Sequence, residues 1–152
     1  IGDTITPIKI DGRLVGQALT NVIKNATEAV DTRVTKDKEA NSGDVEKGFV
    51  RVSLVQSLDK TIITVEDNGL GLPASQKDRL MEPYVTTRTK GTGLGLAIVR
   101  RIMEEHGGTA RIADRKPMGA KAVLAFSHAT LEKRAEKAEQ NELSDQPQAA
   151  AE

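Results

Sequence analysis

The sequence predicts an α/β two-layer sandwich, in which helices cover one face of a mostly antiparallel mixed sheet. Two segments, residues 16–30 and 93–106, carry apolar side chains at helical spacing. Each is followed by a pair of strand-like segments in which apolar and polar residues alternate. A pair of neighbouring strands after each helix favours helices layered on one side of a sheet, and disfavours a doubly wound parallel fold.

The composition indicates one compact, soluble unit. The chain has 152 residues, and a domain of this size buries about 70% of its unfolded surface. The 22 basic and 22 acidic residues cancel, and one tyrosine and two phenylalanines offer little base stacking, so we expect no nucleic-acid contact. The absence of cysteine excludes disulfides and thiolate metal sites. No apolar run reaches the roughly 18 residues of a membrane span.

The first helix is predicted between two polar segments. Residues 4–10 alternate as in an edge strand, and Asp11 stands where a helix N-cap belongs. The apolar face of residues 16–30 is expected to pack inward. Residues 31–48 are rich in Lys, Asp and Glu, and are predicted to form a solvent-exposed loop.

The middle of the chain is predicted to hold a hairpin and two further segments. Residues 49–58 and 61–66 alternate with β-branched side chains, and the second of these strands brings Asp67 to its end. Residues 74–81 are predicted to form a short helix. Residues 82–92 are polar and lead into a glycine-rich segment, which predicts a mobile loop.

The last third is predicted to complete the sheet. Gly107 and Gly108 end the second helix, and residues 109–113 and 120–127 follow as strands. After His128 the composition turns to Lys, Glu, Ala and Gln, which predicts a charged helical extension and a disordered tail. We therefore predict one domain over residues 1–128 and an extension over residues 129–152.

Three alternate glycines, Gly91, Gly93 and Gly95, lead directly into the second helix. Glycines let a bulky anion approach the backbone, and a helix start presents unpaired N–H groups to it, so the segment indicates a phosphate site. A dinucleotide fold also has glycines before a helix. Its spacing requires a third glycine at position 96 or 98, where the sequence has Leu96 and Ile98.

Two further motifs fit a nucleotide site. Asn21 and Asn25 lie four residues apart, so both amides project from one side of the first helix, where an amide oxygen is a reasonable Mg²⁺ ligand. The alternative is a solvated face or a capping role. Asp67 precedes the run Asn-Gly-Leu-Gly, and its carboxylate suits the exocyclic amine of adenine. The alternative is an ordinary Asp-Asn-Gly turn.

Together these motifs resemble the catalytic, ATP-binding domain of sensor histidine kinases, which shares the Bergerat nucleotide fold with gyrase, Hsp90 and mismatch-repair ATPases. The resemblance covers residues 11–127 and four ordered boxes. Residues 21–29 are similar to the N box, 66–71 to the G1 box, 81–88 to the F box and 91–96 to the G2 box.

The resemblance implies roles for individual residues. The residues implied in catalysis are Asn21, Lys24, Asn25 and Arg88, with Asn25 also ligating Mg²⁺. The residues implied in ATP binding are Asn25, Asp67, Gly69, Gly71, Tyr84, Thr87, Lys90, Gly91, Thr92, Gly93, Leu94, Gly95 and Leu96. Asn21 and Lys24 are expected near the phosphates, and Arg88 and Lys90 neutralise them from a lid. Tyr84 replaces the usual phenylalanine of the F box.

The resemblance also implies a reaction and partners. Hydrolysing relatives have a glutamate where this chain has Asn21, so transfer of the γ-phosphoryl group to an imidazole is favoured over hydrolysis. The accepting histidine is expected in a separate dimerisation domain, because neither His106 nor His128 has the acceptor context, and both are expected to be structural. A response regulator is the implied downstream partner, and the chain is expected to be the cytoplasmic part of an inner-membrane sensor, without membrane contact of its own.

Two alternative functions remain open at this point. One is a stand-alone ATPase of the same fold, which would release phosphate without an acceptor. The other is a nucleotide-gated interaction module that binds ATP or ADP without chemistry.

Overall fold

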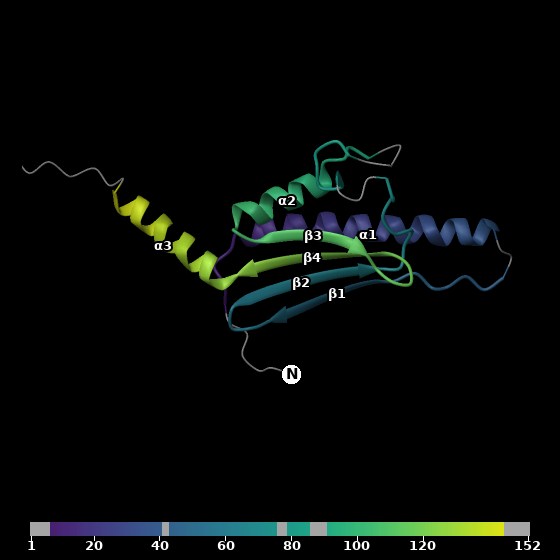
Figure 1. The fold of residues 1–152 in the computed structure, drawn as a ribbon, viewed down its shortest axis with the longest axis horizontal. Coiled ribbons are helices and arrows are strands. Elements are labelled where there is room, and N and C mark those ends of the chain that lie inside the picture. The colour runs from purple at the N-terminus through teal and green to yellow at the C-terminus, as the bar shows by residue number, and fades with distance from the viewer. Residues whose placement is uncertain (1–6, 41–42, 76–78, 86–90, 145–152) are drawn as a thin grey trace, which may run out of the picture.

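The computed structural model describes residues 7–40, 43–75, 79–85 and 91–144, and it confirms the two-layer sandwich (Figure 1). Helices α1 and α2 lie side by side on one face of a four-stranded sheet, and α3 extends away from the end of β4. The elements in chain order are α1 (Gly12–Ala40), β1 (Val50–Gln56), β2 (Lys60–Asp67), α2 (Gly95–Glu105), β3 (Thr109–Asp114), β4 (Ala120–Ser127) and α3 (His128–Ser144).

The sheet has the strand order β1-β2-β4-β3, and every neighbouring pair is antiparallel. The prediction of a mostly antiparallel sheet is confirmed, although the four described strands include no parallel pair of the expected mixed kind. The predicted hairpin forms, with Val52 opposite Val65. The two later strands that were predicted to complete the sheet also pair, with Ile112 opposite Ala122. β2 and β4 are therefore central, and β1 and β3 form the edges.

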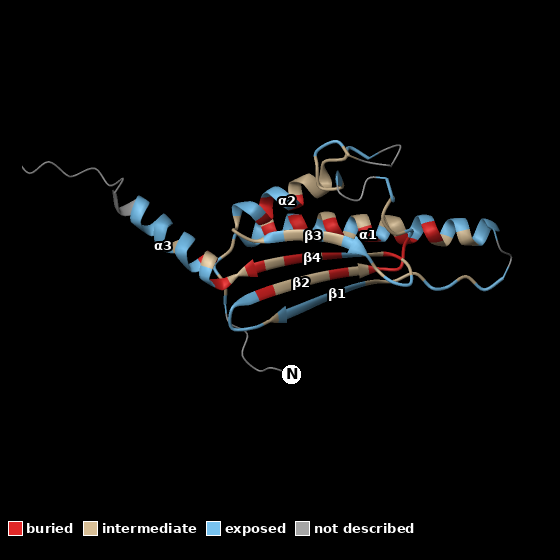
Figure 2. Ribbon diagram, in the orientation of Figure 1, coloured by how far each residue is buried: buried red, intermediate tan, exposed pale blue. Residues whose placement is uncertain are grey.

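The core lies between the sheet and the two helices. Val22 from α1, Met103 from α2, and Leu124 and Phe126 from β4 are almost fully buried. Burial of each such side chain contributes about 1.5–3 kcal/mol. In Figure 2 the buried positions follow the inner sides of α1 and α2 and the two central strands, while β1 is largely exposed. The layer is thus well packed at its centre and open at the β1 edge.

α1 continues ten residues beyond its predicted end at position 30, so the prediction of a loop over residues 31–48 is wrong in its first part. The polar composition of this segment obscured the fact that the inward-facing side of the helix continues beyond position 30. Val30 and Arg33 are buried, and the Arg33–Asp37 ion pair at i,i+4 spacing supports the added turns. Lys, Glu and Ala are also good helix formers, so the charged run extends the helix.

The segment before α1 differs from the prediction. Of the predicted strand over residues 4–10, residues 1–6 lie outside the described residues, and residues 7–10 form no strand. Ile8 and Ile10 pack against the core instead, which uses their apolar side chains without strand pairing. Asp11 caps α1 as predicted, because its Oδ1 accepts the N–H groups of Arg13 at 2.9 Å and Leu14 at 3.1 Å.

The segments around the predicted loop are described only in part. Of the predicted helix over residues 74–81, residues 76–78 lie outside the description, and the described residues on either side form turns rather than an α-helix. Of the predicted mobile loop over residues 82–92, residues 86–90 lie outside it, so its mobility stays a prediction. The predicted tail after residue 144 lies outside the described residues as well.

α3 confirms that the charged segment after the last strand is helical. His128 and Leu131 in its first turn are buried, and Leu131 packs into the core. An ion pair joins Lys9 Nζ to Glu139 Oε1 at 3.1 Å. The core therefore includes the first turn of α3, whereas the rest of the helix extends outward (Figure 1).

Candidate functional site

The first part of the site is the contact between α1 and the start of α2. Asn25 is half-buried on α1, and a Cβ added to Gly95 would lie 3.9 Å from its Nδ2. The predicted metal ligand and the third glycine of the glycine-rich segment are therefore neighbours.

The second part is the turn after β2, which also contacts α1. A Cβ added to Gly69 would lie 2.6 Å from the carbonyl carbon of Ala29 and 2.8 Å from the nitrogen of Val30, so only glycine fits. Asn25 and Ala29 are four residues apart on one helix face. Both glycine segments therefore meet α1 within about one turn, and the three predicted motifs are brought together.

Asp67 ends β2 with only 4% of its surface exposed. Its Oδ1 accepts the N–H groups of Gly69 at 2.8 Å and Ala120 at 3.2 Å. Burial raises the pKa of this carboxyl above its ordinary value, and the two N–H groups and the charge of Arg115 oppose the shift. Within the described residues neither bond uses Oδ2, so the carboxylate retains an acceptor oxygen in a fixed orientation.

The start of α2 is suited to an anion. Leu94 at the N-cap makes no side-chain capping bond, and the first turn holds no acidic residue. The Leu94 N–H donates to Thr92 Oγ1 at 3.4 Å, a long bond. Backbone N–H groups at such a helix start, together with the helix dipole, favour a bound phosphate.

Tyr84 and Gly93 stand on either side of residues 86–90, which lie outside the described residues. The Tyr84 N–H donates to the Gly93 carbonyl at 3.0 Å, so these two residues lie together. Gly93 has a φ of 67°, and a Cβ there would lie 2.6 Å from the carbonyl carbon of Tyr84. Tyr84 itself has a φ of 65° and is 79% exposed. Thr87, Arg88 and Lys90 lie outside the described residues.

The remaining predicted residues surround these contacts. Asn21 is half-buried on α1, and the exposed Lys24 lies 4.0 Å from Glu28. Gly71 has a φ of 75° and approaches Gly119. The rest of the glycine-rich segment comprises Gly91 and Thr92, which are exposed, and Leu94 and Leu96, which are half-buried.

The side chains available as ligands indicate which kind of metal ion the site beside Asn25 could bind. No group of three or more His, Cys, Asp or Glu side chains that could hold a metal ion is found in the described part of the chain. Magnesium commonly takes one or two protein oxygens and completes its shell with phosphates and water. The single amide of Asn25 beside a phosphate-type helix start fits that pattern.

Both histidines are engaged in structural bonds at the opposite end of the sheet. His106 Nδ1 donates to the Ile102 carbonyl at 2.7 Å, and its Nε2 accepts the Asp11 N–H at 3.1 Å. Both ring nitrogens of His106 are therefore bonded within the protein, as expected of a structural histidine. His128 contacts the Leu58 carbonyl and the Thr61 hydroxyl.

Sequence reasoning missed the side chains that hold the Asp67 turn. Asn68 is 2% exposed, accepts the Phe49 N–H at 2.8 Å and donates to the Lys47 carbonyl at 2.9 Å. Arg33 is also 2% exposed. The one sequence signal for Arg33 was its i,i+4 spacing to Asp37 in a run interpreted as a loop.

A family model for histidine kinase-, DNA gyrase B-, and HSP90-like ATPases matches residues 10–130. The chain belongs to this family. The nitrogen regulation protein NtrY of Azorhizobium caulinodans is 52% identical over 109 residues, which make up 71% of this chain and 13% of that protein. The sensor histidine kinase ZraS of Escherichia coli K12 is 34% identical over 80% of this chain and 23% of its own length. The chain thus spans less than a quarter of these relatives.

Solved structures of the same family share the fold. The nucleotide-free catalytic domain of histidine kinase ThkA has a TM-score of 0.63 and 28% identity, covering 80% of this chain and 71% of that one. The mycobacterial sensor histidine kinase MprB has a TM-score of 0.61 and 27% identity over 82% of this chain and 78% of that one. The chain is therefore a histidine kinase-type catalytic domain. Its described residues include no helix with the length and hydropathy needed to cross a bilayer.

Proposed function

We propose that this chain binds Mg-ATP and donates the γ-phosphoryl group to a histidine in a separate dimerisation domain. The observation that carries the proposal is the convergence on one turn of α1: Asn25 beside Gly95, and Gly69 of the Asp67 turn beside Ala29. An amide, a buried carboxylate and an uncapped helix start are the groups that metal, adenine and phosphate each require.

Each residue in this proposal has one task. Asp67 accepts a hydrogen bond from the exocyclic amine of adenine, and the first N–H groups of α2 bind phosphate oxygens. Asn25 supplies an oxygen to Mg²⁺, which when bound neutralises phosphate charge. Asn21 and Lys24 lie near the phosphates, and Arg88 and Lys90 add positive charge from the lid.

Transfer to histidine is preferred over hydrolysis because of position 21. The imidazole nitrogen attacks the γ-phosphorus, the bond to the β-phosphate oxygen breaks, and ADP leaves. Asn21 carries no carboxylate that could orient an attacking water, so the site positions the phosphoryl group and neutralises charge. The domain would work in the cytoplasm as part of an inner-membrane sensor kinase, with a response regulator receiving the phosphoryl group.

The deciding experiment adds a purified dimerisation-histidine domain of a sensor kinase and γ-labelled Mg-ATP to the chain. We expect label on the histidine, and none with the Asn25→Ala variant. Steady phosphate release without acceptor would indicate the stand-alone ATPase instead. Nucleotide-dependent binding of the acceptor domain without label would indicate the interaction module. A comparison of Mg-ATP with Mg-GTP by calorimetry tests the preference for adenine.

A further inference from the structure

Arg33 is a charged side chain on α1 that is only 2% exposed. Its Nη1 pairs with Asp37 Oδ2 at 2.8 Å, and its Nη2 donates to the Glu46 carbonyl at 3.0 Å. Its Nε has no hydrogen-bond partner within the described residues. A buried ion pair is often no more stabilising than apolar side chains of similar size, so this arrangement calls for another role.

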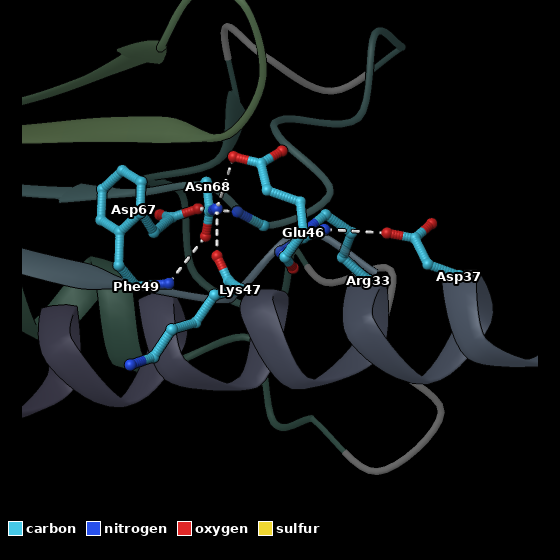
Figure 3. A network of polar contacts seen from close by, with 8 residues as sticks. Arg33, Asp37, Glu46, Lys47, Phe49, Asp67 and Asn68 are labelled. Carbon is cyan, nitrogen blue, oxygen red and sulfur yellow. Dashed lines mark hydrogen bonds and ion pairs between the residues drawn. The ribbon is translucent and has the colours of Figure 1, made fainter. Parts of the chain in front are cut away.

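The segment that Arg33 binds is the one that holds Asn68 (Figure 3). The Glu46 carbonyl is bound by Arg33, and residues 46–49 contact the Asn68 side chain at three points. Asn68 Nδ2 donates to the Lys47 carbonyl at 2.9 Å and lies 3.4 Å from Glu46 Oε1, and Asn68 Oδ1 accepts the Phe49 N–H at 2.8 Å. The Asn68 amide is thus fixed by residues 46–49.

Asn68 lies between Asp67 and Gly69, one of the two residues that orient the Asp67 carboxylate. It follows Asp67 directly and precedes Gly69, whose N–H donates to Asp67 Oδ1 at 2.8 Å. On its other side the turn is pressed against α1, because Gly69 leaves no room for a Cβ beside Ala29. The turn that carries the carboxylate therefore rests on the α1 backbone and on residues 46–49, while the Ala120 N–H binds Oδ1 from β4.

We propose that Arg33 is a positioning residue for adenine recognition, which holds residues 46–49 on α1 and through Asn68 fixes the direction of the Asp67 carboxylate. The inference rests on the proposed function, since it deepens the account of the same site. It also explains the length of α1, because only the turns beyond Val30 carry Arg33 and Asp37 to the returning segment.

The test compares Arg33→Met with a matched control, Arg101→Met. Arg101 makes the same kind of i,i+4 pair, to Glu105 at 2.8 Å on α2, but its side chain is 81% exposed. Calorimetry on the full chain measures the affinity of Mg-ATP and of Mg-purine riboside triphosphate, which lacks the exocyclic amine. The ratio of the two affinities reports the amine contact alone.

We expect Arg33→Met to lower the ATP-to-purine ratio by about 3- to 10-fold, the range for one weakened hydrogen bond, with no change in Arg101→Met. In an Asp67→Asn background, where the bond to the amine is neutral and weaker, Arg33→Met should lower the ratio less than it does in the wild type. Arg33→Lys keeps the charge but cannot bond Asp37 and the Glu46 carbonyl through two separate nitrogens. It replaces Arg33→Met if that variant does not fold, and it should also lower the ATP-to-purine ratio.

An equal fall in both affinities, or an unchanged ratio in the Arg33 variants, overturns the positioning role while leaving ATP binding intact. If the wild-type chain binds neither nucleotide, the proposed function fails and the inference fails with it. If the wild-type chain binds both nucleotides equally, the amine contact of Asp67 is refuted, and so is the role of Arg33.

Discussion

The two ends of the sheet use their polar groups in different ways (Figure 1). At one end His106 and His128 each have both ring nitrogens bonded within the protein. At the other end Asp67 uses one carboxylate oxygen for its described bonds, and the start of α2 has no side-chain cap. Buried polar groups are normally paired, so satisfied groups indicate structure and groups with remaining capacity indicate binding.

The difference shows which titratable side chains are candidates for chemistry. Histidine is a natural candidate for the reacting side chain in phosphoryl transfer, yet both histidine rings here form hydrogen bonds that join separate chain segments. His106 links the end of α2 to the start of α1, and His128 links the start of α3 to the β1–β2 hairpin. The reacting histidine of the proposed function must therefore come from elsewhere.

The largest effect at the binding end of the sheet is expected from removal of the Asn25 amide. We expect Asn25→Ala to weaken Mg-ATP binding by at least about 100-fold, since a metal ligand matters at least as much as the groups that support one. Calorimetry with and without EDTA measures the effect, and the wild-type affinity in EDTA should match that of the variant. Thr27→Ala, at an exposed position of α1, is the control. Normal Mg-ATP affinity in Asn25→Ala would remove Asn25 from the site.

A smaller effect is expected from Asp67→Asn. The variant should bind ATP more weakly by about 1–3 kcal/mol, because a charge-assisted hydrogen bond to the adenine amine becomes a neutral one. Purine riboside triphosphate, which lacks that amine, should lose less affinity in the same titration. An unchanged ATP affinity would mean that the Asp-Asn-Gly segment is only a turn.

A substitution at the histidine end of the sheet should lower the stability of the fold and leave Mg-ATP affinity unchanged. His128→Phe leaves the Thr61 hydroxyl and the Leu58 carbonyl without their ring partner, and should lower the free energy of unfolding by about 1–3 kcal/mol. Urea unfolding measures this loss, and Mg-ATP affinity should not change. Thr61→Val should cost less in the His128→Phe background than alone. A clear loss of ATP affinity would refute the separation of the two ends.

Much of the fold followed from local patterns. β4 begins and ends where alternation predicts, and α2 begins two residues later and ends one residue earlier than predicted. Asp67 was recognised because a strand end followed by glycines is itself a local feature. In these elements the spacing of apolar residues and the positions of the turn residues indicate the same boundaries.

The rest depends on contacts between distant residues. The Arg33 guanidinium is buried by a segment that returns 13 positions later, and Asn68 is fixed by residues 19 to 22 positions before it. Residues 31–40 continue α1 beneath this segment, but their charged composition is also typical of a loop. Their side chains were therefore predicted to be exposed to solvent. Tertiary packing decided both the length of α1 and the environment of Asn68.

The smallest expected effect is a pH-dependent gain in stability from the same Asp67→Asn change. Burial raises the pKa of Asp67 above its ordinary value of 3.8. Below pH 3.8 the carboxyl is protonated in both folded and unfolded chains, so its ionisation costs the fold nothing. As the pH rises past 3.8 the unfolded chain releases its proton first, and the stability of the fold falls until the pH passes the folded pKa.

Asp67→Asn removes that loss, because its amide oxygen can still accept the N–H groups of Gly69 and Ala120. The melting temperature of the variant without nucleotide should therefore exceed that of the wild type at pH 7, and the gap should narrow as the pH approaches 3.8. His128→Phe should instead lower the melting temperature at every pH. A less stable Asp67→Asn variant at pH 7 would make this carboxylate a structural group, and the contrast between the two ends would then fail. A polar side chain whose removal stabilises the fold and weakens binding is retained for its ligand.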